Sequence, residues 1–322
     1  MENMDGVILL ADPESKAWDF ALKIQSYIEE NKKIKVLLDK VSIKHFGNGE
    51  INAEVPESIR KMDVYFIQDS TKNPKEWWVE LLLLKDLFLN SSASSVTYIL
   101  PDMLYSRKDR KDIPHVPISA RALARSISSN LARVITMDLH APQIQGFYPE
   151  NMPLDNLHSY PQVVQYLREH PFNDLKNIVV LSPDAGGARR AESFAKRLGS
   201  IHPIALIDKR RVNAGEIEEM RLVGNVEGKD VIIVDDIIDS GGTLLEAAKK
   251  LKEHGAKNLY CYGTHGIFTK GTQELTAAFS RVITSNTHYQ KVNGVEVVDV
   301  SPVFAEAIYR AQKGLSISKL FE

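Results

Sequence analysis

Short β-branched runs alternate with helix-length amphipathic segments along the whole chain of 322 residues. Strands are predicted over 7–11, 63–68, 95–100, 133–139, 177–182, 204–209, 230–236, 259–264 and 281–286, and helices over 16–30, 75–89, 117–130, 160–169, 187–198 and 243–254. This alternation predicts an α/β fold in which mainly parallel sheets are flanked by helices. In such sheets ligands bind just beyond the carboxyl ends of the strands, so the residues that follow each strand are the candidate functional residues.

The composition is that of an ordinary globular protein, with 43% hydrophobic and 25% charged residues. A formal net charge of −2 gives no general attraction to nucleic acid. The single cysteine, Cys261, excludes a disulfide within the chain and fits a reducing compartment. The first residues contain acids rather than a basic signal-peptide region, and no apolar run approaches the length of a membrane span. We therefore expect a cytoplasmic protein that contacts neither nucleic acid nor membrane.

The chain also contains a candidate internal repeat. Residues 62–88 can be aligned with residues 229–255, so that Asp63 falls opposite Asp230 and Gln68 opposite Asp235. Two unrelated strand–helix units can resemble each other by chance, but a duplication would give two similar domains. The expected boundary lies near residue 150, which gives domains 1–150 and 151–305. Only the second copy has a Gly-Gly turn and an acid pair, so only the second is expected to bind phosphate there.

The acid pair belongs to the stretch "VIIVDDIIDSGGTL" at residues 231–244. Asp235 and Asp236 end a predicted strand, and since neighbouring strand residues face opposite sides, the two carboxylates have different roles. The turn that follows leads into a helix and consists of Asp239, Ser240, Gly241, Gly242 and Thr243. Glycine turns and helix N-termini present N–H groups to anions, and carboxylates accept from ribose hydroxyls. A capped helix without a ligand needs only one such acid or serine, so we expect a sugar-phosphate site.

In the first half, polar residues also gather after predicted strands. The segment "KHFGNGE" (44–50) places an aromatic side chain and a carboxylate around a glycine turn, and residues 107–111 are basic except for Asp109. The basic run is either a solvated loop or, from its position after a strand, a phosphate-binding segment. Asp138 and His140 would share a face if their strand continues. A single histidine such as His140 is, however, more often structural.

In the second half, two more strand ends carry candidate groups. "SPDAGG" places Asp184 where a Mg²⁺-binding carboxylate would lie, although its glycines could simply form a tight turn. "IDKRR" puts Lys209 and Arg211 on one face of an extended segment and Arg210 on the other. Two cations on one face can stabilise the charge of a phosphoryl group during transfer.

The ordered set of these segments resembles a known family. The stretch 231–244 is similar to the 5-phosphoribosyl-1-pyrophosphate (PRPP) signature, which phosphoribosyltransferases and PRPP synthetases share. The segments "KNPKEWWVELLLL", "SPDAGG", "IDKRR", "VDDIIDSGGT" and "THGIF" together resemble ribose-phosphate diphosphokinase (PRPP synthetase) of class I. The resemblance extends from about residue 39 to about residue 287.

The resemblance implies an activity and the roles of the residues that match the family motifs. The family transfers the diphosphoryl group of ATP to the 1-hydroxyl of ribose 5-phosphate, which gives PRPP and AMP. The resemblance implies that Lys209 and Arg211 are the cations that stabilise the transition state, and that His140 and Asp184 are Mg²⁺ ligands. The implied ATP-binding residues are Phe46, Asn48, Glu50, Arg107, Lys108, Asp109 and His140. The implied ribose 5-phosphate site is Asp235, Asp236 and the turn 239–243.

The resemblance also implies the architecture and shows some departures. We expect two phosphoribosyltransferase-type domains with the active site between them, residues 306–322 joined to the first domain, and a homo-oligomer, a hexamer in the family. Asn48 stands where the family has an aspartate, Lys108 where it has a glutamine, and Ile113 and His115 where it has arginines. Two alternatives remain. One is a non-catalytic regulatory paralogue, but such relatives have damaged catalytic segments and these segments are intact here. The other is a phosphoribosyltransferase, which would leave the first-half motifs without a role.

Overall fold

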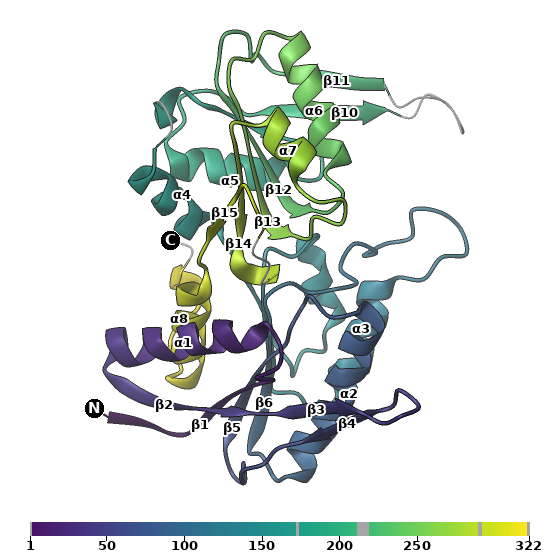
Figure 1. Cartoon of the computed structure of the whole chain (residues 1–322), viewed down its shortest axis with the longest axis vertical. Coiled ribbons are helices and arrows are strands. Elements are labelled where there is room, and N and C mark those ends of the chain that lie inside the picture. The colour runs from purple at the N-terminus through teal and green to yellow at the C-terminus, as the bar shows by residue number, and fades with distance from the viewer. Residues whose placement is uncertain (1, 172–173, 211–218, 289–291, 321–322) are drawn as a thin grey trace. The chain divides into compact units, whose positions relative to one another are not determined.

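A computed structural model of the chain describes residues 2–171, 174–210, 219–288 and 292–320 (Figure 1). The chain forms two compact units. The first unit comprises Met1–His158, Thr287–Tyr289 and Val300–Glu322, and the second comprises Ser159–Asn286 and Gln290–Asp299. The first segment of this unit runs to His158, beyond residue 150, because a short strand at 154–157 pairs in parallel with the strand at 133–137.

The sheet of the first unit has six strands, all parallel, in the order β2-β1-β5-β6-β7-β8. The strands are β1 (Glu2–Ala11), β2 (Ile34–Lys40), β5 (Asp63–Ile67), β6 (Ser95–Leu100), β7 (Arg133–Met137) and β8 (Leu154–Leu157). Helices α1 (Ala17–Lys32) and α8 (Ser301–Gln312) cover one face, and α2 (Pro74–Asn90) and α3 (Ser119–Ile127) cover the other (Figure 1). A separate antiparallel hairpin joins β3 (Ser42–His45) to β4 (Ile51–Glu54). A short 3-10 helix, η1 (Pro142–Phe147), follows β7.

Helix α2 shows how the sequence sets the local structure. The side chain of Asn73 accepts from the backbone N–H of Lys75 at 2.9 Å, and Pro74 occupies the first turn, where its missing N–H leaves no bond unmade. The apolar side chains recur at helical spacing, so that Trp77 and Phe88 face the sheet.

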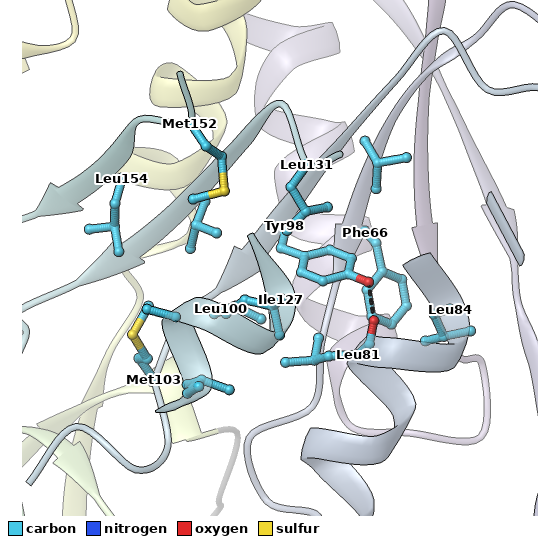
Figure 2. Packing of buried hydrophobic residues seen from close by; sticks show 14 of the residues in the cluster. Phe66, Leu81, Leu84, Tyr98, Leu100, Met103, Ile127, Leu131, Met152 and Leu154 are labelled. Atoms are coloured by element: carbon cyan, nitrogen blue, oxygen red, sulfur yellow. Dashed lines mark hydrogen bonds between the residues drawn. The ribbon is translucent and has the colours of Figure 1, made fainter. Parts of the chain in front are cut away.

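Figure 2 shows the core beneath this helix, where Phe66, Tyr98 and Leu81 pack together. The hydroxyl of Tyr98 donates to the carbonyl oxygen of Leu81, so the buried polar atom is satisfied. Each fully buried side chain of this size contributes roughly 1.5–3 kcal/mol to folding. This packing fixes the strands β5 and β6, whose ends carry the polar loops of the first unit.

The sheet of the second unit has seven strands in the order β11-β10-β9-β12-β13-β14-β15. The strands are β9 (Val179–Ser182), β10 (Ala205–Arg210), β11 (Glu219–Val223), β12 (Val231–Ile238), β13 (Leu259–Gly266), β14 (Arg281–Ser285) and β15 (Val295–Val298). Only the β10–β11 pair is antiparallel. Helices α4 (Tyr160–Glu169) and α5 (Ala188–Leu198) cover one face, and α6 (Gly242–Glu253) and α7 (Gln273–Ala278) cover the other.

The two sheets share one topology, which agrees with the predicted repeat. Reading along each sheet, β10-β9-β12-β13-β14-β15 takes the same order as β2-β1-β5-β6-β7-β8. The turn between β5 and α2 is therefore the counterpart of the turn between β12 and α6. The predicted fold class, two α/β units with mainly parallel sheets flanked by helices, is confirmed. No helix in the described part of the chain is long and apolar enough to span a membrane.

Candidate active site

The acid pair and the glycine turn lie at the carboxyl end of β12, as the sequence predicted. The backbone N–H of Asp236 donates to Oδ1 of Asp235 at 2.9 Å, and the side chain of Asp236 is buried. Gly241 has a φ of +78° and precedes the first residue of α6. A Cβ atom at Gly241 would lie 3.0 Å from Cδ1 of Leu275, so the turn requires glycine for both its conformation and its space. The turn thus leads from the strand that carries the two carboxylates into the N-terminus of α6.

An arginine that sequence reasoning missed lies against the acid pair. Nη1 of Arg190, on α5, lies 3.1 Å from Oδ1 of Asp236 and 3.6 Å from Oδ1 of Asp235. Burial, together with the charge of Asp236, raises the pKa of Asp235 well above its usual value, while Arg190 acts in the opposite direction. The arginine therefore favours the ionised pair, which is the form that accepts hydrogen bonds from sugar hydroxyls. Its only signal in the sequence was its place on the helix that follows "SPDAGG".

Asp184 lies in the turn between β9 and α5, and β9 is the neighbour of β12 in the sheet. Its Oδ1 accepts from the backbone N–H of Gly187 at 2.8 Å, and its carbonyl oxygen accepts from Ser182 Oγ at 2.6 Å. A Cβ atom at Gly187 would lie 2.7 Å from Ser182 Oγ. The glycines therefore do form a tight turn, and this turn orients an exposed carboxylate at the edge of the sheet that also carries the acid pair.

The glycine turn after β12 is tied to the next strand connection. Oγ1 of Thr269 donates to Oδ1 of Asp239 at 2.7 Å, and the backbone N–H of Thr269 donates to the carbonyl oxygen of Asp239 at 3.0 Å. Thr243 lies in the first turn of α6, and Ser240 Oγ accepts from the backbone N–H of Gly242 at 3.4 Å. The turn is thus held in place from outside as well as by its own residues.

Of the two predicted transfer cations, the structure describes only the backbone of Lys209, near the end of β10. The backbone of Lys209 belongs to this strand and pairs with Met220 of β11 in an antiparallel hairpin. Arg211 lies outside the described residues. Since β10 is the neighbour of β9, the backbone of Lys209 lies near the carboxyl end of the strand beside the one that leads into the Asp184 turn.

In the first unit, the predicted ATP residues Phe46, Asn48 and Glu50 surround the tip of the β3–β4 hairpin. The backbone N–H of Phe46 donates to the carbonyl oxygen of Glu50 at 2.8 Å, and the N–H of Glu50 donates to Oδ1 of Asn48 at 3.1 Å. The amide of Asn48 therefore helps to form the turn, and Gly49 supplies its left-handed position with a φ of +89°. The phenyl ring of Phe46 is 56% exposed, which is unusual for an aromatic side chain without a partner surface.

The basic segment after β6 has an exposed tip. Arg107 and Lys108 are exposed, and Nζ of Lys108 lies 2.7 Å from Oδ2 of Asp112. Oδ2 of Asp109 accepts from Nε2 of Gln143, on η1, at 2.7 Å. The segment is therefore tethered to η1 through Asp109, while its basic side chains point away from the core.

His140 follows β7, but not in the way the spacing suggested. The strand ends at Met137, and Asp138 adopts a φ of +41°, so the extended conformation does not continue. Asp138 is buried, and its Oδ1 lies 3.1 Å from Nδ1 of His158. His140 is exposed. The condition under which Asp138 and His140 would share one face is therefore not met, because the strand ends before them.

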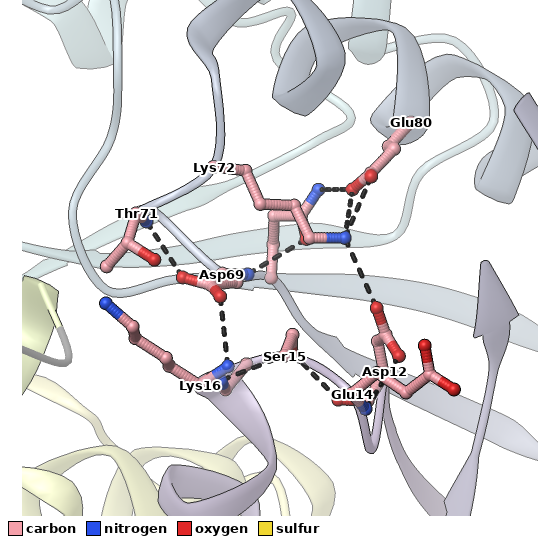
Figure 3. Close-up of polar contacts among 10 residues, drawn as sticks. Asp12, Glu14, Ser15, Lys16, Asp69, Thr71, Lys72 and Glu80 are labelled. Atoms are coloured by element: carbon pink, nitrogen blue, oxygen red, sulfur yellow. Dashed lines mark hydrogen bonds and ion pairs between the residues drawn. The ribbon is translucent and has the colours of Figure 1, made fainter. Parts of the chain in front are cut away.

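The counterpart of the glycine turn in the first unit is filled by side chains of the chain itself (Figure 3). The carboxylate of Asp69 accepts from the backbone N–H groups of Thr71 at 2.8 Å and Lys16 at 3.0 Å. Nζ of Lys72 lies 2.8 Å from Oε1 of Glu80 and 3.3 Å from Oδ2 of Asp12. The amide of Thr71 in this turn thus already binds a carboxylate of the same chain, and so does the amide of Lys16 before α1.

Two α/β units of one topology define a protein of the phosphoribosyltransferase type in duplicate. The family model described as the N-terminal domain of ribose phosphate pyrophosphokinase matches residues 17–130, and the phosphoribosyl synthetase-associated domain matches residues 210–322. Ribose-phosphate pyrophosphokinase of Helicobacter hepaticus is 39% identical over 91% of this chain and 94% of its own length. That of Campylobacter jejuni is 39% identical over 94% and 96%.

A solved structure agrees with these relatives. The crystal structure of phosphoribosylpyrophosphate synthetase from Mycobacterium smegmatis matches with a TM-score of 0.84 and 31% identity, over 96% of this chain and all of that chain. The chain belongs to the ribose-phosphate pyrophosphokinase family.

Proposed function

We propose that this enzyme transfers the diphosphoryl group of ATP to the 1-hydroxyl of ribose 5-phosphate, giving PRPP and AMP for nucleotide biosynthesis. The observation that carries this function is the match to ribose-phosphate pyrophosphokinases across both units and nearly the full length of both chains. In the reaction the 1-oxygen forms a bond to the β-phosphorus of ATP, the bond from that phosphorus to the α,β-bridging oxygen breaks, and the hydroxyl proton is lost. AMP leaves with the bridging oxygen.

Ribose 5-phosphate is assigned to the turn between β12 and α6. The phosphate would accept hydrogen bonds from the turn Asp239, Ser240, Gly241, Gly242 and Thr243 and from the N-terminus of α6. Asp235 and Asp236 would accept from the ribose hydroxyls. This assignment is supported by the neighbouring Arg190, which favours the ionised form of the pair.

ATP is assigned to the strand ends and loops of the first unit. Its base and ribose would lie against Phe46, Asn48 and Glu50, and its phosphates near His140. Arg107, Lys108 and Asp109 would complete the site from the segment after β6. The exposure of the Phe46 ring supports this role, since an apolar ring in water gains free energy when a base stacks on it.

Lys209 and Arg211 are assigned as catalytic residues. Two fixed positive charges at the transferring group favour the transition state, in which negative charge spreads over the phosphoryl oxygens. Such transfers need alignment and charge rather than covalent work by the protein, and the segment "RKDRKDIPH" (107–115) would exclude water when it covers ATP.

The residues present fit a magnesium ion that is shared with the substrate. No group of three or more His, Cys, Asp or Glu side chains among the described residues could hold a metal ion alone. Mg²⁺ commonly takes one or two protein ligands and completes its shell with phosphate oxygens and waters. The oriented carboxylate of Asp184 and the exposed His140 suit this style. When bound, the ion would supply positive charge to the ATP phosphates.

The remaining assignments follow the family resemblance. We propose a homo-oligomer in the cytoplasm, a hexamer as in the family, with neither nucleic acid nor membrane as a partner; light scattering after size exclusion tests the assembly. The alternative of a non-catalytic regulatory subunit is not favoured, because the relatives that match both units are named ribose-phosphate pyrophosphokinase. A phosphoribosyltransferase would not need the first unit.

The experiment that tests the function follows AMP by chromatography with and without ribose 5-phosphate. Formation of AMP only when ribose 5-phosphate is present, together with its near loss in Lys209→Ala, supports the proposal. Equal AMP formation in the Lys209→Ala variant would remove Lys209 from the catalytic role. If the folded wild-type protein forms no AMP, the result would favour the regulatory-subunit alternative.

A further inference from the structure

A buried histidine–carboxylate pair in the first unit has no role in the assignments above. Nδ1 of His288 lies 3.0 Å from Oδ2 of Asp102, and the two side chains are 7% and 4% exposed. Because a carboxylate only accepts, the imidazole donates from Nδ1, either as the neutral ring or as the imidazolium. The two residues are 186 positions apart in sequence, so the contact holds together segments that no local structure connects.

Asp102 lies at the base of the segment assigned to ATP. It follows the end of β6 at Leu100 by two residues and precedes Arg107 by five. The base of the segment is packed: Met103 is buried, and the ring of Tyr105 contacts the ring of Trp78 with centroids 4.7 Å apart. The tip beyond residue 106 is largely exposed. The base is thus held by the burial of Met103, by the ring contact of Tyr105 and by the hydrogen bond between Asp102 and His288.

The His288 side of the pair is itself fixed. His288 ends the 3-10 helix η3 (Asn286–His288), and the carbonyl oxygen of Thr287 accepts from Ser70 Oγ at 2.9 Å. Ser70 follows β5, the neighbour of β6 in the sheet. The imidazole therefore presents its donor from a segment that is hydrogen-bonded to the loop after β5.

We propose that His288 is a positioning residue for ATP: through Asp102 it fixes the base of the segment that carries Arg107, Lys108 and Asp109. The inference rests on the proposed function, because those three residues matter only if they contact ATP. Without the imidazole, the buried carboxylate of Asp102 loses this hydrogen bond, and the link between the base of the segment and η3 is lost with it. Ordering this segment when ATP binds then costs more free energy, which weakens ATP binding.

The test compares three full-length variants with the wild type. His288→Ala removes the donor. His288→Asn places an amide N–H near the position of Nδ1 and keeps it. His254→Ala, an exposed histidine at the end of α6, is the control. KM is measured separately for ATP and for ribose 5-phosphate, and amide hydrogen exchange is measured over residues 102–106 without substrates.

The proposal expects His288→Ala to raise KM for ATP roughly 5- to 30-fold, with KM for ribose 5-phosphate unchanged. Hydrogen exchange over residues 102–106 should become faster, and His288→Asn should restore both readouts toward wild type. Unchanged KM for ATP and unchanged exchange in a folded His288→Ala variant would overturn the inference, as would equal changes in both KM values. If the wild-type protein makes no PRPP, the proposed function fails instead, and the exchange measurement still reports on the anchor.

Discussion

Replacement of Lys72 by methionine should destabilise the first unit strongly. Nζ of Lys72 lies 2.8 Å from Oε1 and 3.0 Å from Oε2 of Glu80, whose side chain is 1% exposed. Removing one member of a buried ion pair leaves the other charge buried, which costs roughly 3–5 kcal/mol. Gln68 still donates to Glu80 at 2.8 Å, and Lys72 is itself 17% exposed. We therefore expect a loss of about 2–3 kcal/mol in the free energy of unfolding.

Urea unfolding followed by tryptophan fluorescence measures this loss in the relevant unit, because all three tryptophans, Trp18, Trp77 and Trp78, lie in the first unit. Lys75→Met is the matched control. This lysine is exposed in the first turn of α2, the helix that carries Glu80, and its replacement should change the free energy of unfolding by less than about 0.5 kcal/mol.

A second variant tests the cause. Lys72→Met combined with Glu80→Gln removes the buried charge together with its partner, so part of the stability should return. A Lys72→Met variant within about 0.5 kcal/mol of the wild type would refute the reasoning, since such a loss is typical of an ordinary surface position.

Three further predictions concern the second unit. Burial and the neighbouring carboxylate raise the pKa of Asp235, so ionisation of this group destabilises the folded state at pH values above its unfolded pKa. Asp235→Asn should therefore stabilise the protein by about 1 kcal/mol at pH 7 and by less at pH 4, as measured by calorimetry. The same variant should have a higher KM for ribose 5-phosphate. Gly187→Ala places a Cβ atom 2.7 Å from Ser182 Oγ, and should cost roughly 1–3 kcal/mol and raise KM for ATP in steady-state assays. Burial raises the pKa of Glu296, but hydrogen bonds from Arg281 and Tyr166 outweigh burial and lower the pKa overall. Glu296→Gln should therefore destabilise the folded state by about 1 kcal/mol at pH 7, and by progressively less as the pH falls below 4, in urea unfolding titrations.

The buried strands and long helices could be predicted from the sequence because their patterns are local. Each predicted strand has a counterpart in the structure, and α2 and α6 lie within two residues of the expected ranges. The turn after β12 was also predictable, since glycines and acids at a strand end have few other physical explanations. Other elements were not predicted. They are the strands β2, β8 and β15, the hairpin β3–β4, the edge strand β11 and the helices α7 and α8.

The parts of the site that were missed depend on long-range contacts. Arg190 reaches Asp236 only because α5 packs beside β12, and nothing in "GARRAES" distinguishes Arg190 from Arg189. The predicted strand 133–139 ends two residues early, at Met137, because Asp138 itself adopts a left-handed conformation that turns the chain. Spacing rules assume that the element continues, and the structure ends it.

The most direct test of the central claim is a phosphorus NMR time course with the purified protein, ATP, ribose 5-phosphate and Mg²⁺. The proposed function predicts that AMP and PRPP appear together in equal amounts while ATP disappears, and that neither forms without ribose 5-phosphate. ATP that stays intact with folded protein, or ADP formed in place of AMP, would contradict diphosphoryl transfer by this enzyme.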